Sequence, residues 1–370
     1  MKILVLGGTG AMGIFLIDLL ANDGATVFVT SRQSREDTGS IHFLKGNTHD
    51  RKFLVELLQN NQFDAIVDFM VYTQKEFQAR MDALLAATRQ YVFLSSARVY
   101  ADSKVSIREA SSRLLDVCED QVYLATDEYA LAKARQEDML KACGKTNWTV
   151  IRPYITYGAG RLQLGVYEKE SWLYRVLCGR SIVFSRDIAA RMTTLSYAYD
   201  VARCIKELVG RDAALGEIYQ VTTDGSLTWA EVLEIYKQII EKKTGKTLKV
   251  IWVDSLYDLG TNRPYYQAEY DRFYNRIFDS AKIVHATGLN NFTTAQEGLE
   301  KSLGAFLMQP SFREINWEQE ALTDKAAGEQ TGLDEIPNAR GKVKYLIYRY
   351  LPRGMAGMLA DVFKRMERFL

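Results

Sequence analysis

The stretch that decides the fold is residues 2–13, KILVLGGTGAMG. Its beginning, Lys2–Leu6, is an apolar run that predicts a buried strand, and glycines follow at once. Gly7, Gly10 and Gly13 are spaced three residues apart. In this pattern the first glycine permits a tight turn, the second lets the backbone approach a pyrophosphate, and the third lets the next helix pack against the strand. The helix N-terminus then offers N–H groups to the phosphates. We therefore predict that a dinucleotide is bound by Gly7, Thr9, Gly10, Ala11, Met12 and Gly13.

The first half of the chain alternates short apolar runs with longer amphipathic segments. Runs rich in β-branched and aromatic residues predict strands over Lys2–Leu6, Thr26–Thr30, Ile41–Leu44, Ala65–Phe69, Tyr91–Ser95 and Trp148–Ile151. Helical spacing of apolar residues predicts helices over Ala11–Asn22, Arg51–Asn60, Lys75–Ala87 and Asp127–Cys143. This alternation is typical of a parallel sheet covered by helices. The expected fold class is α/β, a Rossmann-type doubly wound parallel sheet.

The alternation loosens after Pro153, which predicts a smaller mixed lobe. We expect a loop over Gly158–Gly165 and helices over Tyr167–Cys178 and Trp229–Lys242. Strands are expected over Ser181–Phe184, Glu217–Thr222 and Thr247–Trp252, and Glu217–Thr222 should return to the main sheet. The predicted domains are a dinucleotide-binding domain over 1–155, completed by about 193–225, a substrate lobe over 156–192 and 226–310, and a C-terminal extension over 311–370.

Composition narrows the functional classes. The chain has 370 residues, 47% of them hydrophobic, and a net charge of +1. A charge so near zero argues against nucleic acid as a partner. No apolar stretch approaches the roughly 20 residues of a spanning helix, and scattered cysteines indicate a reduced, cytoplasmic protein. The three histidines share no metal-ligand spacing with a cysteine or with each other, so we expect no metal.

The C-terminal extension changes its charge along its length. Residues 315–335 hold six acidic residues against one basic residue, and residues 340–370 hold eight basic residues against two acidic ones. Charge runs of this kind are usually solvated surface. Apolar residues follow helical spacing at Met355, Met358, Leu359, Val362, Met366, Phe369 and Leu370. This stripe predicts packing on the protein's own core, a homodimer contact, or a peripheral membrane helix with basic flanks. Because every motif lies before about residue 305, we expect the tail to be dispensable for cofactor binding.

The end of the second predicted strand bears on the choice of cofactor. An NAD site usually places a carboxylate there for the ribose hydroxyls. This chain has Thr30–Arg35, TSRQSR, without an acid. The Ser31 hydroxyl and the Arg32 guanidinium would suit the extra phosphate of NADP. The alternative is that Arg32 and Arg35 are only surface charges, in which case they do not select the cofactor. We therefore expect NAD or NADP as the cofactor, and we favour NADP.

A tyrosine and a lysine on one predicted helix could carry acid–base chemistry. Tyr129 and Lys133 are four residues apart and share a helix face. An ammonium near a phenol favours the phenolate, so Tyr129 can exchange a proton with a hydroxyl or carbonyl. Ser96 follows a predicted strand, at the sheet edge where ligands of such folds bind, and can hydrogen-bond the reacting oxygen.

With these motifs the chain resembles the extended short-chain dehydrogenase/reductases, also called the NAD-dependent epimerase/dehydratase family. The matching segments occur in family order over roughly residues 1–305: Gly7–Gly13, Phe93–Tyr100, Tyr129–Lys133 with Glu137, Arg152–Gly158, Tyr199–Ala202, Gly216–Tyr219 and Asp279–Lys282. The resemblance implies that Ser96, Tyr129 and Lys133 form a catalytic triad, and that Lys133 also holds the nicotinamide ribose. It further implies cofactor contacts from Asn47, Thr48, Phe69, Met70, Val71, Ser95, Pro153, Tyr154 and Ile155. Substrate contacts would come from Ser96, Arg98, Thr156, Tyr157 and Arg191.

The chain also departs from the family pattern. The fourth predicted strand ends in Asp68–Val71, DFMV, where many members have small residues. The asparagine that many epimerases use for the substrate diphosphate is replaced by Ile155 or Thr156. The Thr-Asp-Glu of sugar-nucleotide dehydratases is replaced by Ser96–Arg98, SAR, which disfavours dehydration.

Two functional hypotheses follow from these observations. The first is a redox enzyme on a sugar nucleotide, either an epimerase or a ketoreductase. The second is a non-catalytic dinucleotide-binding protein, regulatory or RNA-associated, since the chain also resembles the branch that contains chloroplast stem-loop RNA-binding proteins. The set of Ser96, Tyr129 and Lys133 favours the enzyme.

Overall fold

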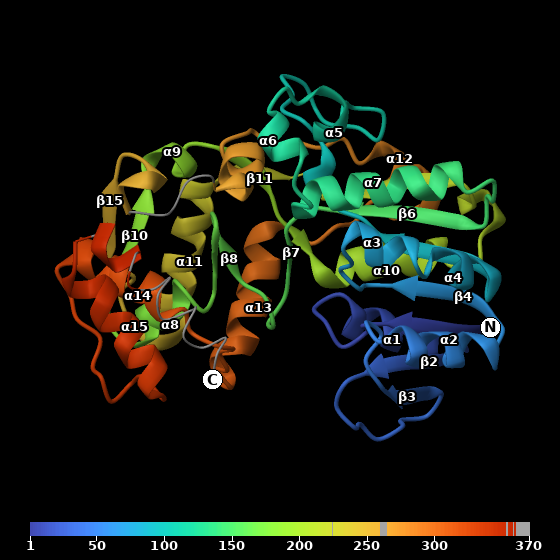
Figure 1. The fold of residues 1–370 in the computed structure, drawn as a ribbon, viewed down its shortest axis with the longest axis horizontal. Helices are drawn as coiled ribbons and strands as arrows, with labels where there is room; N and C mark the ends of the chain where they lie inside the picture. The colour runs from blue at the N-terminus through green and yellow to red at the C-terminus, as the bar shows by residue number, and fades with distance from the viewer. Residues whose placement is uncertain (224, 260–264, 353, 358, 360–370) are drawn as a thin grey trace. The chain divides into compact units, whose positions relative to one another are not determined.

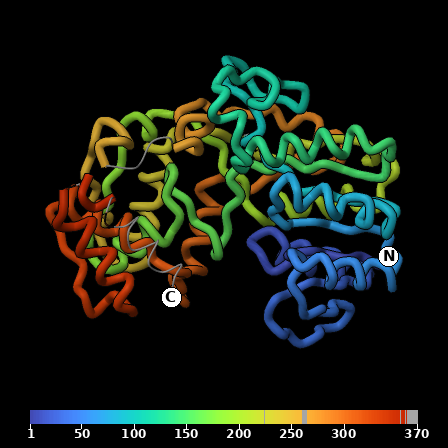
Figure 2. Tube along the Cα trace, in the orientation of Figure 1, coloured from blue at the N-terminus to red at the C-terminus, as the bar shows by residue number. Residues whose placement is uncertain are grey.

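The computed structural model describes residues 1–223, 225–259, 265–352, 354–357 and 359. The chain folds into two compact units, the first made of residues 1–161, 192–226 and 274–302 and the second of 162–191, 227–273 and 303–370. The course of the chain through them can be followed in Figure 2. The sequence assigns residues 274–302 to the substrate lobe, whereas they lie in the first unit.

The first unit is built on a parallel sheet of seven strands in the order β13-β6-β5-β4-β1-β2-β3 (Figure 1). The strands are β1 (Lys2–Leu6), β2 (Thr26–Ser31), β3 (Ile41–Lys45), β4 (Phe63–Asp68), β5 (Thr88–Leu94), β6 (Trp148–Pro153) and β13 (Glu217–Val221). All neighbours pair in parallel. The predicted α/β fold class is confirmed. The strand order reverses between β1 and β4, and ligands of such sheets bind at this point, beyond the carboxyl ends of the strands.

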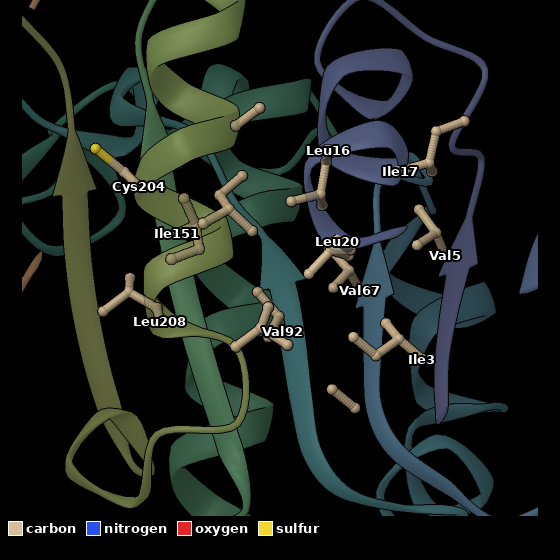
Figure 3. Packing of buried hydrophobic residues seen from close by; sticks show 14 of the residues in the cluster. Ile3, Val5, Leu16, Ile17, Leu20, Val67, Val92, Ile151, Cys204 and Leu208 are labelled. Atoms are coloured by element: carbon tan, nitrogen blue, oxygen red, sulfur yellow. The ribbon is translucent and has the colours of Figure 1, made fainter. Parts of the chain in front are cut away.

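Helices cover both faces of this sheet, as a doubly wound fold requires. On one face α1 (Gly13–Asn22) and α10 (Ala198–Leu208) pack on the sheet, with Leu16, Leu20 and Leu208 buried beside Val67 and Val92 (Figure 3). The other face is covered by α2 (Arg51–Gln59), α3 (Gln74–Gln78), α4 (Met81–Ala86) and α7 (Tyr129–Ala142). The unit also contains η1 (Ala97–Val99), α5 (Leu114–Val117), α6 (Gln121–Leu124), β7 (Thr156–Tyr157), β11 (Met192–Thr194), β12 (Ser196–Tyr197), η2 (Asp212–Ala214) and α12 (Ala281–Thr287).

The structure has two helices where one is predicted over Lys75–Ala87. The first, α3, ends at Gln78, and the second, α4, begins at Met81. Arg80 lies at the break and is buried. Its guanidinium stacks 4.2 Å from the centre of the Tyr72 ring and donates to the carbonyls of Thr48 and His49. A buried guanidinium needs such partners. Periodicity of apolar residues does not reveal this requirement.

The second unit mixes short strands and helices. Its elements are β8 (Gln163–Leu164), β9 (Tyr167–Glu168), α8 (Leu173–Leu177), β10 (Ile182–Ser185), α9 (Arg186–Ala189), α11 (Trp229–Thr244), β15 (Val250–Val253), η3 (Leu256–Leu259), η4 (Ala268–Arg272), α14 (Trp317–Ala327) and α15 (Ala339–Tyr350). Two elements span the bounds of the units, β14 (Ser226–Thr228) and α13 (Ala295–Met308). The helix predicted over Tyr167–Cys178 is too long, because Gly165, with φ of +58°, turns the chain so that β9 pairs antiparallel with β8.

The acidic run of the extension is not only solvated surface, which corrects the interpretation of its charge. Arg175 of α8 is fully buried, and its Nη1 lies 2.7 Å from Glu320 and 2.8 Å from Asp324, both of α14. Its Nη2 lies 2.9 Å from Glu329. Burial raises the pKa of Glu320, whereas the Tyr345 hydroxyl and Arg175 overcome burial and lower that of Asp324. The described part of the extension is therefore bound into the second unit.

The apolar stripe predicted for the tail lies mostly outside the described residues, because 358 and 360–370 are not among them. Met355 and Leu359 are described and exposed. The membrane and homodimer contacts of this stripe stay predictions. In the part of the chain that the structure describes, no helix combines the length and apolarity that crossing a membrane would require.

Candidate active site

The turn between β1 and α1 has the shape that its glycine spacing predicts. Gly7 has a φ of +72°, in the left-handed region that favours glycine. Its N–H donates to the Thr30 hydroxyl over 3.1 Å. At Gly13 a Cβ would come within 2.4 Å of the Gly8 carbonyl oxygen, so a larger residue would displace the backbone. At Gly10 a Cβ would meet only the Gly7 carbonyl oxygen, at an ordinary 3.8 Å.

The N-terminus of α1 fits the diphosphate of a dinucleotide. The residue before the helix, Met12, supplies no side-chain acceptor to the first-turn N–H groups, and the first turn holds no acidic residue. The positive end of the helix dipole is therefore available to an anion. Thr9 and Ala11 lie in the same turn, and Gly10 leaves room beside it.

Replacing Gly10 with Val should abolish dinucleotide binding while the fold persists. The side chain would occupy the room over the turn, and its Cβ would meet the nearest backbone atom only at an ordinary contact distance. Calorimetry with NAD and NADP measures the binding, and thermal unfolding measures the fold. Gly13→Ala is the matched control, since its Cβ would collide with Gly8 and should lower stability. Wild-type cofactor affinity in the Gly10→Val chain would contradict the assignment.

The residues predicted for the adenosine end lie after β2 and β3. Ser31 ends β2, and its hydroxyl accepts the Gln33 N–H over 3.3 Å. Arg32 follows and is exposed. Asn47 is exposed, and its Oδ1 accepts the His49 N–H over 3.1 Å. Thr48 is buried, with its carbonyl accepting from Arg80. Of these residues, Arg32 and Asn47 present exposed side chains.

The loop after β4 lies against the glycine turn. A Cβ on Gly7 would come within 2.9 Å of the Met70 sulfur and 3.7 Å of the Phe69 Cβ. The Met70 N–H donates to the fully buried Asp68 carboxylate over 2.9 Å. Val71 is 55% exposed, so it contributes little to this packing. The structure thus brings Phe69 and Met70 to the predicted cofactor turn.

Lys133 connects this loop to β5. Its Nζ donates to the Leu94 carbonyl over 2.6 Å and to the Met70 carbonyl over 3.3 Å, and it lies 4.5 Å from the centre of the Phe93 ring. Burial lowers the pKa of Lys133 to about 8, opposed by the carboxylates of Asp68 and Glu137. The ammonium is therefore fixed at the carboxyl end of β5, between two strands that end at the predicted site.

Ser96 and Tyr129 meet at the same edge. Ser96 follows β5 and precedes η1, and Tyr129 is the first residue of α7. Burial raises the pKa of Tyr129, opposed by the Arg98 guanidinium and by a hydrogen bond with Ser96. The Arg98 guanidinium carbon lies 5.4 Å from the centre of the Tyr129 ring. This arrangement can hold a reacting oxygen between a serine hydroxyl and a phenol.

Ser95 serves a buried ion pair. Its hydroxyl donates to Glu137, which also binds Arg152 at 2.9 Å from the guanidinium Nε. Glu137 and Arg152 are almost fully buried. Arg113 joins the pair, with its Nη1 3.6 Å from Glu137. These contacts stabilise the junction of α7 and β6, so the Ser95 hydroxyl is occupied within the protein.

The segment after β6 is buried and strained. Tyr154 packs on the Phe278 ring at 4.9 Å between centres. Ile155 has a φ of +30°, the one positive value among the described non-glycine residues. Such a conformation costs a β-branched residue about 1–3 kcal/mol and is common at functional sites. Pro153 before it and Thr156 after it are both buried.

Two of the predicted substrate contacts are not among the residues that these contacts bring together. Tyr157 is buried against α13, where a Cβ on Gly298 would collide with its hydroxyl. Arg191 is exposed and belongs to the second unit, where its carbonyl accepts the Trp229 N–H over 3.1 Å. Within the first unit the structure brings together the glycine turn, Phe69, Met70, Lys133, Ser96, Tyr129 and Arg98.

Sequence reasoning missed Asp68 and Glu128. The sequence marks Asp68 only as a departure from the small residues of the family, yet its carboxylate accepts hydrogen bonds from Met70, Tyr91 and Tyr72. Glu128 lies 2.6 Å from Arg98. Two features of the sequence could have indicated these residues. Asp68 is a charged residue at the end of an apolar strand, and Glu128 is a charged residue directly before the tyrosine.

The chain is similar in sequence to a known family and to a curated protein. Residues 3–222, more than half of the chain, match the NAD dependent epimerase/dehydratase family. A curated relative, the chloroplast stem-loop binding protein of 41 kDa b of Arabidopsis thaliana, is 27% identical over 244 residues. The match covers 62% of this chain and 60% of that relative, so the chain spans about three fifths of the relative's length.

Solved structures show the same fold. WbmH of Bordetella bronchiseptica, in complex with NAD+, aligns with a TM-score of 0.62 and 16% identity over 84% of this chain and 99% of that chain. UDP-glucose 4-epimerase of Thermotoga maritima aligns with a TM-score of 0.64 and 16% identity over 84% of this chain and all of that chain, 100%. The family's cofactor is a nicotinamide dinucleotide, in agreement with the glycine turn. The chain belongs to the NAD-dependent epimerase/dehydratase family.

Proposed function

We propose that the chain is an NAD(P)-dependent oxidoreductase or epimerase that moves a hydride at a hydroxyl or carbonyl carbon of a sugar nucleotide. The observation that carries the proposal is the meeting of Ser96 and Tyr129 beside Lys133 and the glycine turn, all in the first unit. A phenol and a serine hydroxyl at one point are suited to proton exchange with a substrate oxygen.

Each residue has a separate task in this proposal. Ser96 hydrogen-bonds the reacting oxygen, and Tyr129 takes its proton as the alcohol is oxidised or returns it as the carbonyl is reduced. Lys133 holds a positive charge at the end of β5, where it steadies the Met70 loop over the cofactor turn. The nicotinamide, when bound, accepts or supplies the hydride.

The substrate class rests on the family and on its solved members. The Thermotoga epimerase is described with UDP-glucose, and MoeE5 with UDP-glucuronic acid and NAD. Mass spectrometry of the nucleotide that copurifies with the chain, followed by a product screen of uridine-, guanosine- and thymidine-diphosphate sugars, tests the proposal. We expect a nicotinamide dinucleotide and turnover of at least one sugar nucleotide. A cofactor-loaded chain that converts none of them would argue against this substrate class.

Arg32 should make NADP bind more tightly than NAD. It is exposed directly after β2, and residues 30–35 hold no carboxylate for the ribose. A charge-assisted contact with the extra phosphate is worth roughly 1.5–3 kcal/mol, or about tenfold and upward in affinity. Calorimetry of NAD and NADP binding to the wild-type chain and to Arg32→Gln measures the ratio of the two affinities. The variant should lose the preference, whereas Arg35→Gln, whose guanidinium lies 5.8 Å from the Phe43 ring centre, should change it less. Equal affinities in the wild-type chain would show that Arg32 does not contact the cofactor.

A second candidate function is favoured by the stem-loop binding relative. In this case the chain would bind dinucleotide without catalysis and associate with RNA. The net charge of +1 supplies little attraction for a phosphate backbone. Salt-dependent retardation of a stem-loop RNA by the chain, together with no turnover in the sugar screen, would favour this second function.

A further inference from the structure

The phenol of Tyr129 needs a cation to act as a base. The residue begins α7 and is partly buried. Burial raises the pKa of Tyr129, because a phenolate loses hydration inside the protein. A positive charge close to the ring favours the phenolate and opposes this effect. Which side chain supplies that charge decides how readily Tyr129 exchanges protons.

Lys133 directs its ammonium elsewhere in this structure. Although it shares a helix face with Tyr129, its Nζ donates to the carbonyls of Leu94 and Met70, over 2.6 and 3.3 Å. Two carbonyl acceptors at these distances hold the ammonium at the end of β5. Its main charged neighbours are the carboxylates of Asp68 and Glu137.

Arg98 faces Tyr129 directly. Its guanidinium carbon lies 5.4 Å from the ring centre, and its side chain is only 14% exposed. Glu128, the residue before the tyrosine, holds the guanidinium, with a carboxylate oxygen 2.6 Å from Nη2. The backbone N–H of Arg98 donates to the Ser96 hydroxyl over 3.2 Å, which fixes the main chain of this residue. Glu128 itself accepts from the Ala130 N–H over 2.7 Å. The guanidinium is thus held by Glu128 over the Tyr129 ring.

We propose that Arg98 is a positioning residue that stabilises the phenolate of Tyr129, and that it does so in addition to any effect of Lys133. The inference rests on the proposed role of Tyr129 as acid and base. An arginine suits the task because it stays charged and holds a fixed plane. In this role Arg98 contacts Tyr129, whereas the family resemblance implies a contact between Arg98 and the substrate.

The other charged groups around the phenol do not cancel this effect. Arg161, from the loop after β7, has the same sign as Arg98 and also favours the phenolate. Glu128 opposes it, but its influence on Tyr129 is smaller than that of either arginine. The Glu128 carboxylate also accepts from the Tyr123 hydroxyl over 3.1 Å, so part of its charge is compensated by a neutral donor. Removing Arg98 therefore leaves a phenol that is harder to ionise.

The test is a pH titration of Tyr129 in the full chain without substrate. Isotope-labelled tyrosine followed by NMR reports each phenol, and the spectrum of Tyr129→Phe identifies the signal. Arg98→Gln should raise the pKa of Tyr129 by roughly one to two units, the size expected for a unit charge at this separation in a partly buried site. Arg98→Lys keeps a cation and should restore most of the shift.

Controls separate this inference from the proposed function. Arg89→Gln removes an arginine that is 78% exposed near the amino end of β5 and should leave the titration unchanged. Arg98→Met replaces Arg98→Gln if the latter does not fold. A Tyr129 signal that titrates at the same pH with and without Arg98, or in neither chain before unfolding, overturns the inference. Because no substrate is present, a failure of the sugar-nucleotide assignment would not alter this result.

Discussion

Replacing Arg175 with Met should lower the free energy of unfolding of the second unit by about 3–5 kcal/mol, the usual cost of removing one partner from a buried ion pair. Arg175 is fully buried and binds Glu320, Asp324 and Glu329 at 2.7–2.9 Å. The variant would leave these carboxylates without the guanidinium. The tryptophan fluorescence of a denaturant titration reports this unit, because four of the five tryptophans lie in it.

A surface pair in the same unit is the matched control. Lys237 is 34% exposed and lies 3.3 Å from Glu234, which is 55% exposed. Such pairs contribute about 0–1 kcal/mol, so Lys237→Met should be nearly silent. Equal losses in both variants would show that the Arg175 cluster does not hold the extension. Truncation after Pro310 removes all three carboxylates at once, so the tail can be dispensable for cofactor binding and still be needed by the second unit.

Replacing Tyr129 with Phe should reduce turnover by a factor on the order of 10²–10⁴, the usual contribution of a general acid or base. The variant keeps the ring beside Arg98 and loses only the proton-carrying oxygen. Cofactor affinity by calorimetry should therefore stay close to that of the wild type. Lys133→Ala should instead weaken both turnover and cofactor binding, because Lys133 also holds the Met70 loop.

The control for this prediction is another tyrosine of the first unit. The Tyr219 hydroxyl donates to the Ala213 carbonyl over 3.4 Å, away from the residues of the predicted site. Tyr219→Phe should keep full turnover. If Tyr129→Phe were as active as Tyr219→Phe on the same substrate, the acid–base role would belong to another group.

The sheet and the cofactor turn could be predicted because local features determine them. Inner strands such as β1 and β4 are mostly apolar runs that are buried on both faces, so their pattern is visible without knowledge of their neighbours. The glycines of the turn are needed for reasons of backbone geometry, as the contact between Gly13 and Gly8 shows. The tyrosine and lysine at four-residue spacing likewise share a face wherever a helix forms.

The remaining features depend on contacts between distant residues. Arg175 and Asp324 are 149 positions apart, so their charges could be interpreted from the sequence only as separate surface runs. Arg98 and Glu128 are 30 positions apart, and nothing in either segment indicates that they meet over Tyr129. Arg80 lies at the break between α3 and α4, and its guanidinium donates to the carbonyl of Thr48, 32 residues earlier. These contacts arise from tertiary packing.

The most direct test of the central claim is the fluorescence of reduced nicotinamide when the cofactor-loaded chain is mixed with sugar nucleotides. With the oxidised cofactor bound, the wild-type chain should form the reduced nicotinamide, transiently for an epimerase and lastingly for an oxidoreductase. Tyr129→Phe, loaded equally with cofactor, should form it at least about a hundredfold more slowly. Equal rates in the two chains, or no reduced nicotinamide and no product from any sugar nucleotide, would contradict the account.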